Sequence, residues 1–148
     1  MAAQSLTLAQ IRAEMAGANP RPVYLLHGEE AYYVDRLVEE FSALVPEDDR
    51  DFNLTVIYGT QQLDPHLVEE SCRRYPMMAD RQVVILKEAQ TMRADQLDKL
   101  APYVSKPTPS TIFVIAFRGD KAKGRNLLQA VAASGASYES KKLTEKTV

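Results

Sequence analysis

Two short segments of this 148-residue sequence end in residues that could take part in phosphate chemistry. An apolar run, Val23–His27, stops at Gly28 and Glu29, and a second run, Val83–Leu86, is followed by Lys87 and Glu88. A glycine-containing loop after a strand can wrap phosphate with its backbone. A carboxylate after a neighbouring strand can hold Mg²⁺ or orient the attacking water. These residue types at these positions suggest the chemistry of nucleotide hydrolysis.

The phosphate-binding half of such a site is incomplete. Counting a phosphate-loop motif forward from Gly28 places Tyr33–Asp35 where glycine, lysine and serine or threonine are required. Glu29 and Glu30 would place negative charge at the start of the next helix, where they complement the helix dipole and repel phosphate. We therefore expect no functional P-loop here.

The metal-binding half is incomplete as well. Lys87 stands where the metal-binding Asp is required, and its ammonium would repel the cation, so that Glu88 alone remains. His27, His66 and Cys72 show neither metal-ligand spacing nor the surroundings of a nucleophile and its base. The sequence predicts no bound metal or cofactor. These residues fit a nucleotide-hydrolysing core that has lost its metal site, or an unrelated α/β domain, equally well.

The segments that position these residues alternate between apolar runs and amphipathic stretches. Runs rich in β-branched residues predict buried strands, and apolar residues three or four apart predict helices packed on the sheet. Strands are expected over Val23–His27, Leu54–Tyr58, Val83–Leu86, Thr111–Phe117 and Ser137–Leu143. Helices are expected over Leu8–Ala16, about Ala31–Leu44, from Pro65, about Ala94–Val104 and Asn126–Ala133. This order predicts an α/β fold with three layers (α/β/α) and a mostly parallel five-stranded sheet.

Local signals locate some boundaries. Thr7 and Gln10 are spaced as a capping box, and Asp64 before a proline is typical of a helix start. Gly135 is expected to close the last helix. Two further expectations are a polar loop over Pro46–Asp51 and a buried face on the helix after Pro65, formed by Leu67, Val68 and Cys72.

The composition is that of a globular protein, with 45% hydrophobic and 26% charged residues. A net charge of −2 argues against DNA binding by bulk charge alone. The single cysteine, Cys72, rules out an internal disulfide and fits a reducing cytosol. The sequence lacks an apolar run of membrane-spanning length and the pattern of a signal peptide, so we expect a cytoplasmic protein without membrane contact.

Several segments resemble the delta subunit of bacterial DNA polymerase III. Pro22–Glu30, followed by Val34–Arg36, resembles the opening of that family. Met77–Leu86 is similar to its most characteristic stretch, which is an apolar pair, a small residue, a polar residue, Arg and an apolar strand. Thr111–Ala116 and Tyr138–Leu143 resemble the family's fourth and fifth strands. The resemblance covers essentially the whole chain from Pro22 onward.

The resemblance implies a role in DNA replication. Residues 1–143 would form an N-terminal AAA+-like domain that neither binds nor hydrolyses ATP, and residues 144–148 would begin the linker or helix towards a following domain. The subunit would bind and open the sliding clamp, contact other clamp-loader subunits mainly through later domains, and meet DNA in the assembled complex. On its own it would be no enzyme, but part of a DNA-directed DNA polymerase (nucleotidyltransferase) holoenzyme.

The resemblance also implies a clamp-binding site. In the family, the apolar pair before the Arg-containing strand inserts into a hydrophobic pocket of the clamp. Here that pair is Met77 and Met78, with Pro76 ahead of it to hold it rigid, where the family more often has a larger Leu-Phe type pair. Methionine adapts to apolar pockets, and burying one contributes roughly 1.5–3 kcal/mol. The alternative is that both methionines cover the domain's own core. Arg81 either supports this site by bonding loop carbonyls or is an ordinary exposed arginine.

A basic cluster after the fourth strand could touch DNA phosphates or an acidic partner, or be a solvated loop. It comprises Arg118, Lys121, Lys123 and Arg125. The alternative function is an atypical nucleotide-dependent hydrolase or phosphotransferase that uses Glu88 with Lys87 or Lys121. A receiver-like signalling domain is disfavoured, because Lys87 replaces the carboxylate that such a domain needs.

Overall fold

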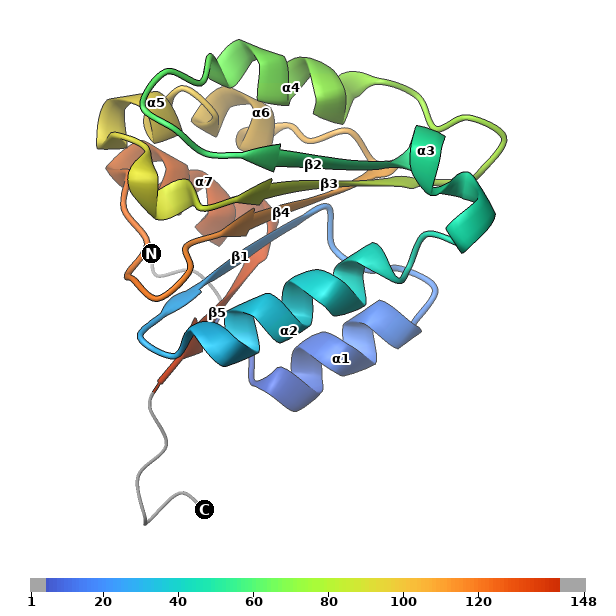
Figure 1. Cartoon of the computed structure of the whole chain (residues 1–148), viewed down its shortest axis with the longest axis horizontal. Helices are drawn as coiled ribbons and strands as arrows, with labels where there is room; N and C mark the ends of the chain where they lie inside the picture. Colours follow the sequence, from blue (N-terminus) through green and yellow to red (C-terminus); the bar gives the residue numbers. More distant parts are fainter. Residues whose placement is uncertain (1–4, 142–148) are drawn as a thin grey trace.

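The computed structural model describes residues 5–141 of the chain. Within this range, five parallel strands form one sheet in the order β2-β3-β4-β1-β5 (Figure 1). The strands are β1 (Val23–Gly28), β2 (Leu54–Tyr58), β3 (Gln82–Lys87), β4 (Thr111–Ala116) and β5 (Ala136–Ser140). Because the strands are parallel, all their carboxyl ends lie at one edge of the sheet, the carboxyl edge, and all their amino ends lie at the other, the amino edge.

Helices cover both faces of this sheet and complete three layers, which confirms the predicted fold class (Figure 1). One face carries α1 (Leu8–Ala16) and α2 (Ala31–Ser42). The other carries α4 (Pro65–Arg73), α5 (Ala94–Asp98), α6 (Ala101–Ser105) and α7 (Arg125–Ser134). Shorter turns of helix complete the described chain: η1 (Glu47–Asp49), α3 (Arg50–Asn53) and η2 (Ala89–Thr91). Within residues 5–141, no helix has the length and apolar character needed to cross a bilayer.

The central strands are buried on both faces, as their uninterrupted apolar runs predict. In β1, Val23 and Leu25 pack into the core under α4–α7, whereas Tyr24 and Leu26 pack into the core under α1 and α2. Side chains alternate between the two faces because the repeat of a strand is two residues. The two cores therefore hold the sheet between two helical layers.

The predicted helix starts are confirmed. The Gln10 backbone N–H donates to Thr7 Oγ1 at 3.1 Å and the Thr7 N–H donates to Gln10 Oε1 at 2.8 Å, which completes the capping box of α1. Asp64 caps α4 by accepting from the His66 backbone N–H at 2.9 Å. Both caps satisfy helix-terminal N–H groups with side chains only a few residues away, which is why the local sequence reveals them.

Several predicted boundaries were wrong. The helix expected over Ala94–Val104 is divided into α5 and α6, because Pro102 lacks the N–H that a continuous helix would bond to Asp98. The polar loop expected over Pro46–Asp51 contains η1 and the first residues of α3. Three expected ends shift: α2 stops at Ser42, β4 at Ala116 and β5 at Ser140. Residues 142–148, with the predicted strand exit and linker start, lie outside the described residues.

Leu67 was predicted to be buried and is not. Its side chain is 54% exposed, whereas Val68 and Cys72, which are four residues apart on α4, are fully buried. Leu67 points about 100° away from Val68 around the helix, towards the edge strand β2. No helix lies beyond β2 in the described chain, so nothing covers Leu67.

Candidate functional site

The two groups of candidate residues lie at opposite edges of the sheet. Gly28 and Lys87 end strands β1 and β3, so the degenerate nucleotide residues lie at the carboxyl edge. Residues 75–81, here called the tip loop, connect α4 to the start of β3 and lie at the amino edge, at the right of Figure 1. The six-residue length of β3 separates them. The tip loop and the Lys87–Glu88 segment flank the same strand in the sequence, but they belong to two separate sites at opposite edges of the sheet.

At the carboxyl edge, Gly28 is packed against β5. Its φ is +126°, a conformation that favours glycine, and a Cβ there would clash with the Ser140 backbone. The Gly28 N–H donates to the Asp120 carbonyl at 2.7 Å. The backbone group that a phosphate loop would offer to its ligand is bonded within the protein.

The N-terminus of α2 is also satisfied internally. Glu30 is its N-cap, and the carboxylate accepts from the Tyr32 N–H at 3.1 Å. Ser140 Oγ donates to the Glu30 carbonyl at 2.7 Å, while Glu29 is exposed beside it. A carboxylate at a helix N-terminus is favourable on its own account and repels a second anion. The expectation that a carboxylate complements this helix start is confirmed for Glu30; that it repels phosphate stays a prediction.

Lys87 and Glu88 line a cavity of about 260 Å³ together with residues of α2 and the loop after β4. The Lys87 ammonium lies 5.3 Å from the centroid of the Tyr58 ring, a cation–π contact. Glu88 adopts a left-handed conformation (φ +57°) and accepts a hydrogen bond from Gln90 Nε2 at 3.1 Å. Within residues 5–141, no group of three or more His, Cys, Asp and Glu residues could hold a metal ion.

The structure divides the predicted basic cluster. Arg118 Nε donates to both carboxylate oxygens of Asp35, at 2.9 and 3.0 Å. Lys123 Nζ donates to the Gln90 carbonyl at 3.0 Å. Lys121 and Arg125 instead line a separate cavity of about 690 Å³ between β1, β5 and α7. The four cations do not form one phosphate-binding surface, and their contact with DNA stays a prediction.

His27 lines that second cavity and makes a hydrogen bond within the fold. Its Nδ1 accepts from the Ala122 backbone N–H at 3.3 Å. Burial lowers the pKa of His27, Glu139 opposes this shift and Lys121 reinforces it. Burial therefore favours the neutral form of His27.

At the amino edge, the tip loop presents both methionines to solvent. Met77 is 55% exposed and Met78 is 99% exposed, so neither covers the domain's own core. Tyr75, also in the tip loop, and Phe52, on α3, are large exposed residues as well. Met78 has a φ of +54°, which costs a non-glycine residue roughly 1–2 kcal/mol. An apolar side chain with no internal contact, carried on a strained backbone, is typical of a binding residue.

The tip loop is anchored by polar side chains. Gln82 Nε2 donates to the Arg74 carbonyl at 2.6 Å, and Arg81 donates to the Ala18 carbonyl, beyond α1, at 3.1 Å. Arg81 thus bonds a loop carbonyl, one of its two predicted roles, although the carbonyl belongs to a neighbouring loop. The side-chain amide of Asn53 donates to the Met77 carbonyl and accepts from the Met77 N–H. Neither Asn53 nor Gln82 was predicted from the sequence, where their only signal is a polar residue beside an apolar run.

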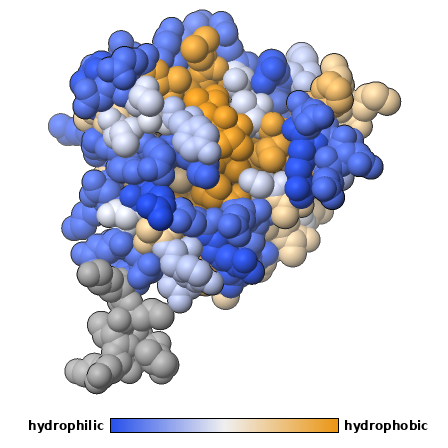
Figure 2. Space-filling view, in the orientation of Figure 1, coloured by the Kyte–Doolittle hydropathy of each residue, from blue (hydrophilic) through white to orange (hydrophobic). Residues whose placement is uncertain are grey.

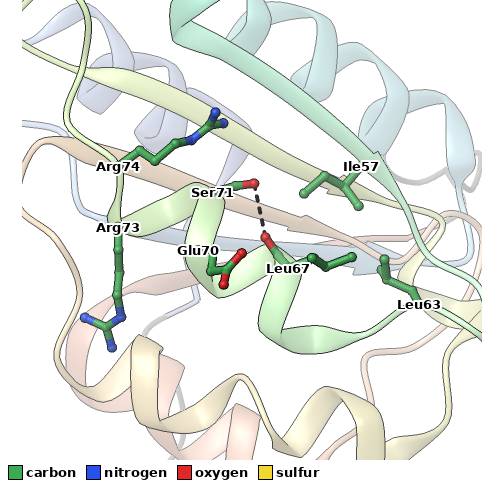
Figure 3. Close-up of a pocket in the computed structure, with 7 residues that line it drawn as sticks. All are labelled: Ile57, Leu63, Leu67, Glu70, Ser71, Arg73 and Arg74. Carbon is green, nitrogen blue, oxygen red and sulfur yellow. Dashed lines mark hydrogen bonds between the residues drawn. The ribbon is translucent and has the colours of Figure 1, made fainter.

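An apolar groove of about 710 Å³ runs between β2 and α4. Ile57, Leu63 and Leu67 form its floor (Figure 3), and the space-filling view shows a hydrophobic area over these two elements (Figure 2). Charged residues at the carboxyl-terminal end of α4 border it: Glu70, Arg73 and Arg74. The groove explains why Leu67 stays exposed at an edge of the sheet.

The strand order β2-β3-β4-β1-β5, with Gly28 packed against β5, defines a three-layer α/β domain built on an all-parallel sheet. A sequence model of the family described as "DNA polymerase III, delta subunit" matches residues 24–140. The chain belongs to this family. The predicted family is confirmed.

Two solved structures share the fold. The "Bacillus subtilis DNA clamp loader delta protein (YqeN)" superposes with a TM-score of 0.77 at 24% identity, over 93% of this chain and 43% of that one. A DNA polymerase III gamma subunit-related protein of Thermotoga maritima superposes with a TM-score of 0.60 at 13% identity, over 93% and 46%. The chain therefore spans less than half the length of these two proteins. None of the curated proteins matches the sequence.

Proposed function

We propose that this chain is the clamp-binding domain of a clamp-loader subunit that does not hydrolyse ATP. The observation that carries the proposal is the exposure of Met77 and Met78 on an anchored loop, at the positions of the family's apolar pair. Membership of the delta family and similarity to a protein titled as a clamp loader delta protein support it. The domain would act in the cytoplasm as a non-catalytic part of the polymerase holoenzyme.

The mechanism would be mechanical. Burial of the two methionines in an apolar pocket of the sliding clamp would contribute roughly 1.5–3 kcal/mol for each side chain. Binding opens the ring only if the domain binds the open form more tightly than the closed form, because a ligand shifts an equilibrium by its difference in affinity. ATP would be handled by neighbouring subunits, and DNA would be met in the assembled complex.

The test is binding of this domain to the sliding clamp of its own source, by surface plasmon resonance or calorimetry. We expect the Met77→Ser/Met78→Ser variant to bind at least about 100-fold more weakly, since it lacks the two apolar side chains that the clamp would bury. Its thermal transition should stay close to that of the wild type, because neither side chain is in the core.

The matched control is Tyr32→Ser, which removes a large exposed side chain from α2, near the opposite edge of the sheet. This variant should bind like the wild type. If the wild-type domain does not bind the clamp, or if both variants bind equally well, the proposal is wrong.

The nucleotide-dependent alternative has little support at the carboxyl edge. Gly28 is closed by β5, the α2 N-terminus is capped by Glu30, and Lys87 occupies the metal position. Each of these features by itself would weaken the binding of a magnesium–nucleotide complex.

A further inference from the structure

We infer that Asn53 is a positioning residue that holds the tip loop in the conformation in which Met77 and Met78 bind their partner. The inference rests on the proposed function of these two methionines. It adds a residue from another element, α3, which lies 24 positions earlier in the chain.

The Asn53 side-chain amide pairs with the backbone of Met77 in both directions. Its Nδ2 donates to the Met77 carbonyl at 2.8 Å, and the Met77 N–H donates to its Oδ1 at 2.8 Å. Asn53 is 1% exposed, so water competes little for either bond. One side chain thus gives Met77 the two hydrogen bonds that a neighbouring strand would give it.

The tip loop needs such a support because its own sequence provides little. Residues 76–80 have no regular secondary structure. Met78 adopts a left-handed backbone conformation, and its 99% exposed side chain has almost no packing that could maintain it. The conformation at Met78 is therefore set by the residue before it, whose two backbone hydrogen-bonding groups are bonded to Asn53.

Other contacts hold the ends of the loop and would survive the loss of Asn53. Gln82 bonds the carbonyls of Ser71 and Arg74 where α4 ends, and Arg81 bonds the Ala18 carbonyl where β3 begins. A variant at position 53 should therefore keep the loop attached and change only the conformation of its tip.

The chain offers a matched control in Gln96. This buried amide donates to the carbonyls of Thr60, Gln61 and Leu63, at 3.1, 3.1 and 2.9 Å. It holds the loop after β2, at the carboxyl edge, away from the tip loop. Gln96→Ala therefore removes a comparable buried amide without touching the proposed binding residues.

The experiment compares Asn53→Ala, Asn53→Ser and Gln96→Ala with the wild type, at a temperature at which each variant is folded. We expect Asn53→Ala to weaken clamp binding at least about tenfold, mainly through a slower association rate, because only the fraction of molecules with the correct tip can bind. Asn53→Ser should show the same change if Asn53→Ala does not fold. Gln96→Ala should bind within about twofold of the wild type.

Hydrogen exchange of the Met77 amide gives an independent measurement. It should be protected in the wild type and in Gln96→Ala, and should exchange rapidly in both Asn53 variants. Unchanged exchange in these variants, or clamp binding no weaker than that of Gln96→Ala, would overturn the inference. A wild-type domain that does not bind the clamp would instead reject the proposed function, and exchange would still decide whether Asn53 holds the tip.

Discussion

A Cβ added to Gly28 would lie 2.0 Å from the carbonyl oxygen of Ser140. The two residues are paired at the end of the β1–β5 ladder, so β5 fills the space beside the first residue of the would-be phosphate loop. The loop after β1 is thus closed by packing against backbone, and not only by its unsuitable side chains. The side chains of the loop and its packing against β5 are thus two independent arguments against phosphate binding at this position.

Replacing Gly28 by alanine should therefore destabilise the domain by about 3 kcal/mol or more, since rigid backbone has to move. The matched control is Gly119→Ala, because Gly119 also has a positive φ (+75°) but its Cβ would meet only Ala31, at 4.0 Å. That variant should lose only about 1–2 kcal/mol, the cost of the left-handed conformation. Urea unfolding measures both, and equal losses would show that the contact with Ser140 has no effect.

Titration with Mg²⁺-ATP should give no saturable binding at micromolar concentration. Glu30 occupies the α2 N-terminus, and the Lys87 ammonium stands where a metal-binding carboxylate is required. Calorimetry or a fluorescent nucleotide analogue would measure this, with an ATP-binding protein as the positive control. Micromolar binding would favour the nucleotide-dependent alternative over a clamp-binding domain.

Two neighbouring positions on α4 should respond differently to truncation. Val68→Ala should cost about 2 kcal/mol of unfolding free energy, because Val68 is fully buried under the sheet. Leu67→Ala should cost less than about 1 kcal/mol, although it removes more atoms, because Leu67 lies in the open groove beside β2. Chemical denaturation of both variants tests the observed orientation of α4; a larger loss at Leu67 would contradict it.

His27 should make stability depend on pH. Burial lowers its pKa in the folded state, so below its unfolded pKa of about 6.5 the unfolded chain binds the proton more readily. Stability should therefore fall as pH decreases through about 6.5 towards the lower folded-state pKa, by at most about 1.4 kcal/mol per pH unit.

The variant His27→Asn keeps an acceptor for the Ala122 N–H and removes this titration. Its unfolding free energy should therefore change less with pH than that of the wild type, as measured by urea unfolding at several pH values. His66→Gln, which removes an exposed histidine on α4, is the control. An unchanged pH slope in His27→Asn would show that His27 does not contribute.

The sequence by itself determined the layers of this protein and supplied the prediction that it binds no nucleotide. Uninterrupted apolar runs such as Val83–Leu86 require cover on both faces, so the buried parallel sheet follows from composition and spacing. Caps such as Thr7 and Asp64 act over three residues or fewer. The prediction that magnesium and phosphate are not bound rests on the charges of Lys87 and Glu30, which end a strand and start a helix.

Tertiary structure alone decided which apolar side chains remain outside. Leu67 and Val68 are similar in type, and only the position of α4 beside an edge strand separates them. Met77 and Met78 could have covered the core, and their exposure depends on where α4 ends relative to β3. Asn53 meets Met77 across 24 positions of chain. Such contacts arise only when separate elements are brought together, so no local pattern of residues specifies them.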